Sequence, residues 1–403
     1  MSLKFGLRFR LIVMFGLLVF TPLFAIGESP ELKNDYRSGS IILKNSPGFG
    51  EGTDWDLQFY NTFTDITVAP DGSIFAASSR QHTIFKFDSK GTLIKSFGQE
   101  GQGPGDFNGP GDLSILDEKY LVVGEYALGL RISLFDLDGN FVKLLKTNHS
   151  VYSPTALRNG KIAYLGLAHR EEDKQNPVQI QTVYIKDINT QEETEVHSFR
   201  TSARSIRLKS GGSIGFGNDT GGWTYLCQTI EGNLAVGISM ESHITVYSPE
   251  GSKLSEFVLK GKPVPVTKSI IRNFKDIQLN DMRQDPQSQQ GRRNENLKEL
   301  EKASFDHLFN DFLPLYNEIL VDEEGHFLVF RKDDCFADCP ILLEVYTPQG
   351  EFVSVTEIKT GEYNLIVDRR RKHMCFTKNG LVALVQPKNN IPDFQLMLIK
   401  VEF

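Results

Sequence analysis

The chain has 403 residues, 44 basic and 51 acidic side chains, and a formal net charge of −7. An acidic balance argues against nucleic acid or anionic lipid as the main partner, because both require a basic surface. The length would permit two domains, but a repeat fold would make one domain of it.

The first 27 residues read as a secretory signal. Lys4, Arg8 and Arg10 precede an apolar run over residues 11–25, and small residues stand where cleavage after Gly27 would need them. The alternative is an uncleaved anchor, although the run is shorter than the roughly 20 residues of a bilayer span. Cleavage would leave 41 basic and 51 acidic residues. We therefore expect a secreted or periplasmic protein with no stable membrane span.

The segment Asp65–Phe107 sets the pattern for the rest of the chain. It predicts four short strands, at residues 65–69, 73–77, 83–87 and 92–97. Proline, aspartate and glycine at residues 70–72 and at 88–91 predict tight turns between them. A glycine-rich run over residues 98–105 follows. Four antiparallel strands repeated every few tens of residues are typical of a β-propeller blade.

Degraded copies of this unit continue to the C-terminal end. The turn between the first two strands, here called the inner turn, recurs at residues 71–72, 117–118, 159–160, 231–232, 324–325 and 379–380. The outer turn between the last two strands recurs at residues 88–91, 136–139, 187–190, 249–251 and 348–350. The sixth unit therefore lacks a fourth strand, and the apolar segment Ser40–Lys44 is the candidate to supply it. We predict an all-β fold over residues 28–403, a six-bladed β-propeller whose N-terminal strand closes the last blade.

One insertion, at about residues 261–312, interrupts the repeat between the fourth and fifth blades. Apolar residues at helical spacing predict helices at its two ends: Ile270, Ile271, Phe274 and Ile277, then Leu297, Leu300, Leu308 and Phe312. The polar stretch at residues 285–296 predicts a mobile loop. The insertion would be either a lid or partner-binding arm, or a decorated loop packed on one blade.

The segment Thr67–Pro110 resembles an NHL-type repeat, with its PDG inner turn, its D-x-x-G outer turn and a GPG-x-F run. The whole mature chain is similar to secreted bacterial six-bladed propellers of that kind. The resemblance implies the propeller fold and a binding scaffold, while NHL-like propellers elsewhere include lyases and hydrolases. The third unit departs from the pattern around its outer turn.

Ligands of propellers generally use the rim where second strands connect to third strands and fourth strands to first strands. The rim candidates for ligand binding in this sequence are Arg80, His82, Glu125, Tyr126, His169, Glu241, His243, Arg331 and Gln386. His169, His243 and Glu125 would suit acid–base chemistry, but isolated polar loop residues are the simpler interpretation. Because the rim positions are poor in metal ligands, we expect no metal and no cofactor.

The sequence contains four cysteines. Cys335 and Cys339 lie in one rim connection, and a secreted setting permits a disulfide between them. Cys227 and Cys375 fall in first strands and are expected to be buried. The favoured function is an extracytoplasmic module that recognises a protein, peptide or glycan partner. The alternatives are a lyase or hydrolase with its site at the channel mouth, and a structural part of an envelope assembly.

Overall fold

A computed structural model describes residues 40–45, 48–49, 63–125, 130–170, 178–202, 204–209, 213–216, 220–284, 292–332, 339–359, 361, 363–365, 374–377, 380–387 and 395–402. The predicted signal, Tyr126 and Cys335 lie outside these residues. The cleavage and disulfide predictions therefore stay predictions.

Four sheets each have four antiparallel strands in chain order. The first holds β2 (Phe63–Val68), β3 (Ile74–Ser78), β4 (Thr83–Phe87) and β5 (Leu93–Phe97). The second holds β6 (Pro110–Leu116), β7 (Tyr120–Glu125), β8 (Arg131–Asp136) and β9 (Phe141–Lys146). The third holds β10 (Tyr152–Leu157), β11 (Lys161–Arg170), β12 (Val178–Asp187) and β13 (Glu193–Ser202). The fourth holds β16 (Thr224–Gln228), β17 (Leu234–Ile238), β18 (His243–Tyr247) and β19 (Lys253–Val258).

A nine-stranded sheet contains the remaining repeat units. Its first part is β20 (Glu318–Val321), β21 (Phe327–Arg331), β22 (Ile341–Tyr346) and β23 (Phe352–Lys359). Its second part is β24 (Tyr363–Leu365), β25 (Met374–Thr377), β26 (Gly380–Pro387) and β27 (Gln395–Glu402). The N-terminal strand β1 (Ser40–Asn45) lies between the parts, antiparallel to β27 and parallel to β23.

The sequence predicted six blades, and the structure has five separate sheets of four or more strands. The physical reason is the double pairing of β1. It lies beside β27, as the sequence predicted, and its other edge also pairs with β23, which joins the last two repeat units into one sheet.

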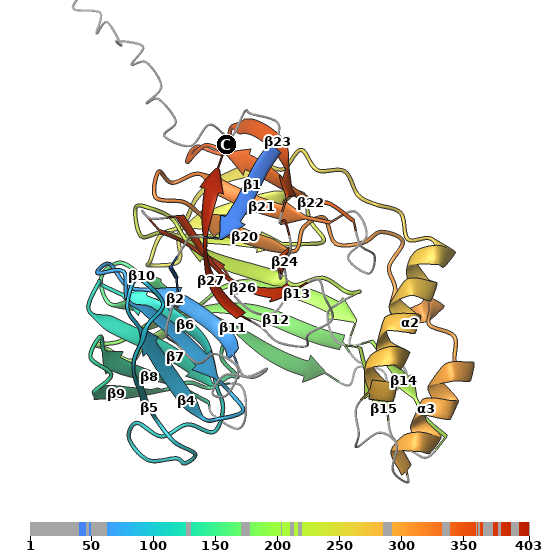
Figure 1. Cartoon of the computed structure of the whole chain (residues 1–403), viewed down its shortest axis with the longest axis horizontal. Helices are drawn as coiled ribbons and strands as arrows, with labels where there is room; N and C mark the ends of the chain where they lie inside the picture. The colour runs from blue at the N-terminus through green and yellow to red at the C-terminus, as the bar shows by residue number, and fades with distance from the viewer. Residues whose placement is uncertain are drawn as a thin grey trace, which may run out of the picture. The chain divides into compact units, whose positions relative to one another are not determined.

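The first strands of successive units contact one another around a ring (Figure 1). β2 contacts β6, β6 contacts β10, β10 contacts β16, and β16 contacts β20. β25 contacts both β20 and β2, which completes the circuit. This arrangement confirms an all-β propeller.

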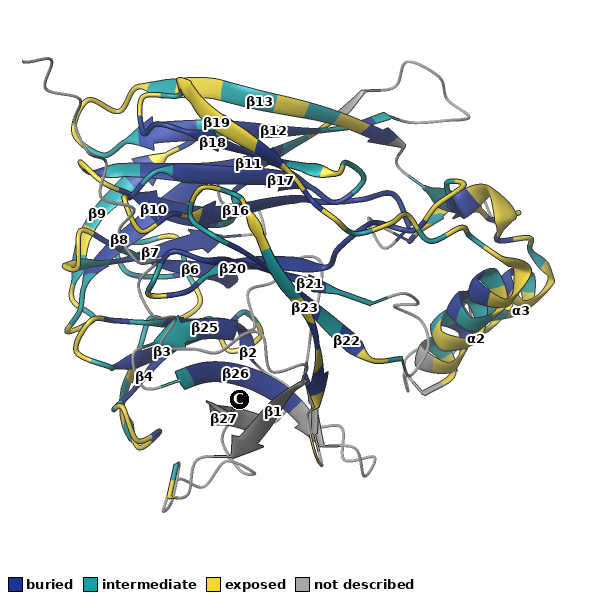
Figure 2. Ribbon diagram, turned by 90° about the horizontal axis from the view of Figure 1, so that it is seen from above, coloured by how far each residue is buried: buried dark blue, intermediate teal, exposed yellow. Residues whose placement is uncertain are grey.

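Burial falls from the inner strands to the outer ones within a unit (Figure 2). Every residue of β3 is buried, whereas β5 alternates between intermediate and exposed positions, as expected for a strand with one solvated face. The first and second sheets share a core that includes Phe75, Ile84, Leu121 and Val123. Each such side chain contributes about 1.5–3 kcal/mol through removal of its surface from water.

Adjacent inner strands belong to different sheets, so side chains satisfy backbone groups between them. The Leu113 N–H donates to Oδ2 of Asp65 at 2.5 Å, and the Ser153 N–H donates to Oδ2 of Asp112 at 2.5 Å. Ser153 lies within a register shift of its strand, where the register gives it no strand partner, and Leu113 lies at the end of such a shift. Both carboxylates are almost completely buried. We call these two contacts the carboxylate clamps.

The insertion forms a subdomain together with a second insertion, which is the connection between β13 and β16. It contains α2 (Lys268–Gln284), α3 (Arg292–Lys302) and the 3-10 turn η2 (Asp306–Leu308). The ribbon of β14 (Ser205–Arg207) and β15 (Ser213–Gly215), from the connection between β13 and β16, lies beside the helices (Figure 1). A separate apolar core joins the two insertions, with Phe216, Phe274 and Phe305 in contact. We call this the helical subdomain.

Two details of the insertion differ from the sequence prediction. Residues 292–296 were expected in a loop but form the start of α3, because the acidic and amide side chains there also suit a first helical turn. Ile277 lies in α2 as predicted and is 38% exposed, whereas Phe312 was predicted in a helix but lies beyond α3 and η2 and is 44% exposed. None of the helices in the described ranges is long and apolar enough to cross a membrane.

We expect the Asp65→Ala variant to lose about 1–3 kcal/mol of unfolding free energy, because the Leu113 N–H would be buried without an acceptor. Asp65→Asn keeps an acceptor oxygen and should lose less. Urea unfolding measures both, with exposed Glu351→Ala as the matched control. Equal stability of Asp65→Ala and Glu351→Ala would show that the clamp is dispensable.

The Phe274→Ala variant should open the helical subdomain selectively. Phe274 is fully buried there, and truncation of a buried phenylalanine costs about 3–5 kcal/mol. Hydrogen exchange in α2 and α3 should accelerate while the strands of the first two sheets keep their protection. Ile277→Ala, on the exposed side of α2, is the control. Uniform acceleration throughout the propeller would contradict an independent subdomain core.

Candidate functional site

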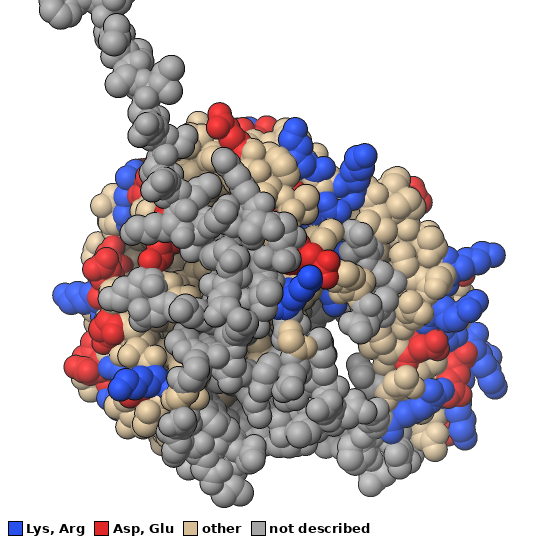
Figure 3. Space-filling view, turned by 45° about the horizontal axis from the view of Figure 1, so that its top comes forward, with Lys and Arg blue, Asp and Glu red and all other residues tan. Residues whose placement is uncertain are grey.

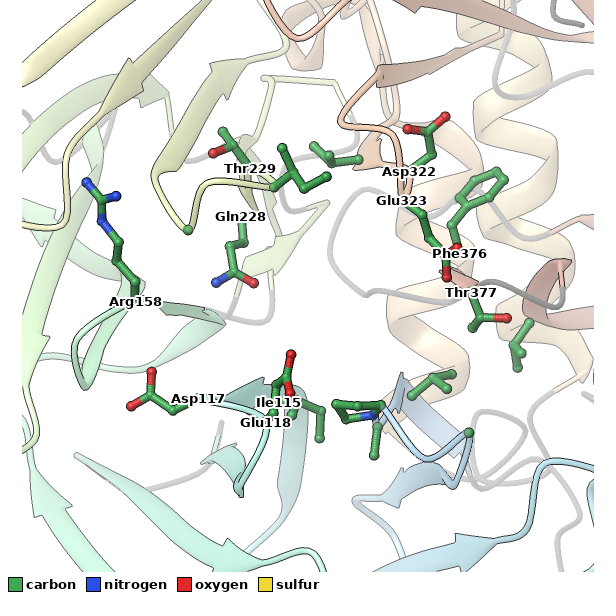
Figure 4. Close-up of a pocket in the computed structure, with 18 of the residues that line it drawn as sticks. Ile115, Asp117, Glu118, Arg158, Gln228, Thr229, Asp322, Glu323, Phe376 and Thr377 are labelled. Carbon is green, nitrogen blue, oxygen red and sulfur yellow. The ribbon is translucent and has the colours of Figure 1, made fainter. Parts of the chain in front are cut away.

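A cavity of about 560 Å³ lies at the inner turns. It is lined by residues in or next to all six inner turns that the sequence identified: Gly72, Asp117, Glu118, Arg158, Glu231, Gly232, Asp322, Glu323 and Thr377. Figure 4 shows Asp117, Glu118, Arg158, Asp322, Glu323 and Thr377 around this cavity. We call this cavity the inner-turn mouth. It faces the opposite ends of the strands from the rim that the sequence favoured, because inner turns and second-to-third connections terminate opposite ends of each second strand.

Some polar side chains at the inner-turn mouth stabilise their own turns. Asp322 is buried, and its Oδ1 accepts the N–H groups of Glu324 and His326 at 3.0 and 2.8 Å. Oε2 of Glu231 accepts the Thr229 hydroxyl at 2.8 Å. These contacts fix the turn geometry and leave the cavity rigidly framed.

Other charged groups at the inner-turn mouth face solvent. Asp117, Glu118 and Glu323 are exposed, and so is Arg158 on the neighbouring unit. With the exposed Glu231, the exposed carboxylates outnumber the single arginine among the described lining residues. The mouth is therefore acidic, and it favours a cationic group.

Asp117 and Glu118 lie in a turn that requires an unfavourable, left-handed backbone conformation. Their φ angles are +50° and +54°, and the Lys119 N–H closes the turn on the Leu116 carbonyl at 3.0 Å. Left-handed backbone costs a residue other than glycine about 1–2 kcal/mol. Asn-Gly is the usual solution for such a turn. Two carboxylates in its place indicate a role for the charge at the mouth.

Apolar side chains also line the cavity. Ile74, Ile115, Val321 and Val382 are among them, and Ile230 is 56% exposed. An exposed apolar side chain beside exposed carboxylates suits a ligand that carries both apolar surface and a positive group.

The rim candidates from the sequence fall into several environments. Glu125 is completely buried in β7, where Oε1 lies 2.5 Å from Nε of Arg131 and Oε2 accepts the Asn108 N–H at 2.8 Å. Arg131 also donates to the carbonyls of Gln102 and Asp106. The pair therefore holds the glycine-rich run against its blade.

Arg331 belongs to a similar internal network. Its guanidinium contacts Oε1 of Glu344 at 2.5 Å, and Oε2 of Glu344 accepts the Tyr346 hydroxyl. Burial, followed by that hydrogen bond, raises the pKa of Tyr346. The tyrosine oxygen in turn accepts the Lys260 N–H at 2.7 Å, so this group supports the start of the insertion.

Among the described rim candidates, Glu241 and His243 are the pair in direct contact, at 3.1 Å between Oε2 and Nε2. Arg80 is exposed, and His82 has a left-handed backbone at φ +53°. His169 and Gln386 lie in β11 and β26, and their side chains are outside the described residues. Cys227 and Cys375 are buried in first strands, as expected.

In the sequence the inner turns serve as landmarks of the repeat, and the predicted site lay at the other rim. The available signal was their charge, since Asp117-Glu118 replaces the usual asparagine and glycine, and Glu323 and Glu324 precede the glycine of the turn at 324–325. Within the described ranges, no three His, Cys, Asp or Glu side chains gather as metal ligands.

No protein-family model and no curated protein matches the sequence. Solved structures match it in fold. A member of the DUF4221 family from Bacteroides vulgatus has a TM-score of 0.50 at 10% identity, over 90% of this chain and 99% of that one. An exported protein from Bacteroides fragilis has a TM-score of 0.48 at 13% identity, over 90% of this chain and 95% of that one. Virginiamycin B lyase from Staphylococcus aureus has a TM-score of 0.40 at 9% identity, over 83% of this chain and 79% of that one. The chain is a β-propeller protein, and these likenesses extend to the fold alone.

Replacement of Glu125 distinguishes a supporting role from a rim contact. Glu125→Ala would leave the Arg131 cation buried without its partner, which typically costs about 3–5 kcal/mol. Glu125→Gln keeps an acceptor and should cost less. Urea unfolding gives the stability, and limited proteolysis within residues 98–105 reports release of the loop. A stable Glu125→Ala variant with a protected loop would contradict the supporting role.

Proposed function

We propose that this protein is an extracytoplasmic β-propeller that binds a partner at the inner-turn mouth. The observation that carries the proposal is the cavity of about 560 Å³, to which residues in or beside every inner turn contribute. Binding sites in repeat folds draw single side chains from many repeats onto one surface. The inner-turn mouth has that construction, and it combines turn-anchored residues with exposed charges.

The partner at this mouth carries a positive group next to an apolar one. Asp117, Glu118 and Glu323 would attract the cation, and the exposed side chain of Ile230 would accept the apolar part. A segment of peptide or protein with lysine or arginine beside an apolar side chain has this chemistry. A glycan would need an amino group to use the same charges.

Six blades are the count that we propose for the ring. Six first strands, β2, β6, β10, β16, β20 and β25, contact one another in a closed order. The nine-stranded sheet divides at β1, whose parallel pairing with β23 spans only three residues on each strand. We therefore interpret that sheet as two neighbouring blades joined at an edge.

The location outside the cytoplasm rests on the secretory pattern of residues 1–27. The rim at the second-to-third connections is a second proposed surface, where Arg80, Glu241 and His243 offer exposed or half-exposed polar groups. A protein, peptide or glycan partner would contact it without entering the cavity.

The charge reversal Glu118→Lys with Glu323→Lys should reduce binding at the mouth at least tenfold. Two labelled peptide pools of random sequence serve as probes, one with a fixed central lysine or arginine and one with glutamine there. The wild type should retain the cationic pool preferentially, because each exposed charge contributes up to about 1 kcal/mol at low salt. Fluorescence anisotropy measures retention.

The matched control reverses two exposed charges on outer turns, Glu250→Lys with Glu351→Lys. It should change binding less than twofold. Equal losses in both double variants would reduce the effect to net charge and refute the mouth. Stoichiometric calcium or zinc in elemental analysis of the purified protein would instead favour the lyase or hydrolase alternative.

A further inference from the structure

A second cavity lies within the helical subdomain and has the opposite charge. It has a volume of about 330 Å³ and is lined by Arg207, Lys209, Lys298 and Lys302, with Glu299 and three apolar residues. The cations come from two insertions far apart in sequence, the β14 ribbon and helix α3. We call it the basic cavity.

The surrounding sequence reinforces this charge. Residues 203–222 and 261–312, which build the subdomain, contain twelve basic and nine acidic side chains, although acidic residues predominate in the whole chain. Lys and Arg side chains gather at the right-hand edge of Figure 3, on the side where Figure 1 places α2 and α3. The basic character is therefore local to the subdomain.

The cations in the basic cavity outnumber its one carboxylate. Lys298 and Lys302 are four residues apart on α3, and like charges at this spacing destabilise a helix by about 0.2–0.5 kcal/mol. No ion pair to any of the four cations is found among the described residues. Glu295 and Glu301 lie three residues from Lys298, and Glu299 lies three residues from Lys302, but the cations that line the cavity still outnumber its one carboxylate and favour an anion.

Glu299 contributes one negative charge to the basic cavity, and the four cations leave the lining with a net positive charge. Its Oε2 accepts the backbone N–H of Lys209 at 2.7 Å, which ties the ribbon to α3. This contact fixes the distance between the two cationic elements. Ile206 and Leu208, beside the cavity, are buried in the core shared with Phe274. The four flexible cations are therefore presented from a defined frame.

Arg204, at the start of the same ribbon, forms hydrogen bonds within the subdomain and is not among the residues that line the basic cavity. Its guanidinium donates to the carbonyl of His307 and to the side-chain oxygen of Asn310. These neutral acceptors join the ribbon to the segment after α3. Burial lowers the pKa of Arg204. Arg204 thus anchors the subdomain and leaves recognition to the cations of the basic cavity.

From this juxtaposition we infer that the basic cavity binds a ligand bearing phosphate groups. Four cations that line one cavity suit the negative charge of a phosphate ester or polyphosphate, and arginine and lysine are the usual protein partners of phosphate. The phosphate would come from a soluble phosphoester or from a lipid headgroup. This site is separate from the inner-turn mouth and does not depend on its function.

The test measures binding of two probes to the full mature chain at low ionic strength. Inorganic tripolyphosphate represents a soluble source, and vesicles of phosphatidylglycerol in phosphatidylcholine represent a lipid source. The Lys298→Glu with Lys302→Glu variant should weaken binding of the preferred probe at least tenfold. Raising the salt concentration should weaken wild-type binding as well. Binding of tripolyphosphate alone identifies the soluble source, and binding of vesicles alone identifies the lipid source.

The matched control is Lys268→Glu with Arg272→Glu, which reverses two exposed cations on α2 outside the basic cavity. It should change binding less than twofold. Since all four positions are exposed, circular dichroism should show folded protein in each case. Equal losses in both variants, or tight binding of poly-glutamate with neither phosphate probe bound, would overturn the inference.

Discussion

Inner strands of neighbouring blades touch without forming a common sheet, so each leaves backbone groups that water cannot reach. In the first three units, buried side chains on one strand satisfy amides on the next: Asp65 for Leu113, Asp112 for Ser153, and Ser114 for Ala156. Gln181 does the same for Thr224 from the third sheet to the fourth. A buried amide without an acceptor would cost as much as a lost hydrogen bond or more. These contacts help to set the spacing of the first four units and of their inner turns.

The ring so fixed presents opposite charges at different places. The inner-turn mouth carries exposed carboxylates on tight turns, whereas the helical subdomain carries lysine and arginine on a ribbon and a helix. Separation of this kind lets one chain contact two partners of unlike charge without the two sites neutralising each other. The helical subdomain has an apolar core of its own. This core holds together two insertions that are distant in sequence.

The repeat pattern was sufficient to predict the propeller, because each turn and strand depends on local chemistry at fixed intervals. The partner of the N-terminal strand was also predictable, since the sixth unit lacked a strand. The ribbon at Ser205–Arg207 was missed because three residues carry no periodicity. The basic cavity was invisible for a different reason: its residues lie on two segments whose meeting depends on Phe216 and Phe274. The burial of Glu125 with Arg131 likewise depends on a pairing between strands that composition does not reveal.

The place of β1 between β23 and β27 has a consequence for the order of folding. The strand belongs to the beginning of the chain, and its partners are more than 300 residues further on, as the pairing of Ile42 with Glu402 shows. Bringing such distant segments together is slow, because the entropy of closing the loop is lost before any contact compensates for it. During synthesis or export the earlier blades would already be assembled while β1 is still unpaired. Closure of the ring is therefore the last event, and an interrupted chain would expose two unpaired strand edges to its neighbours.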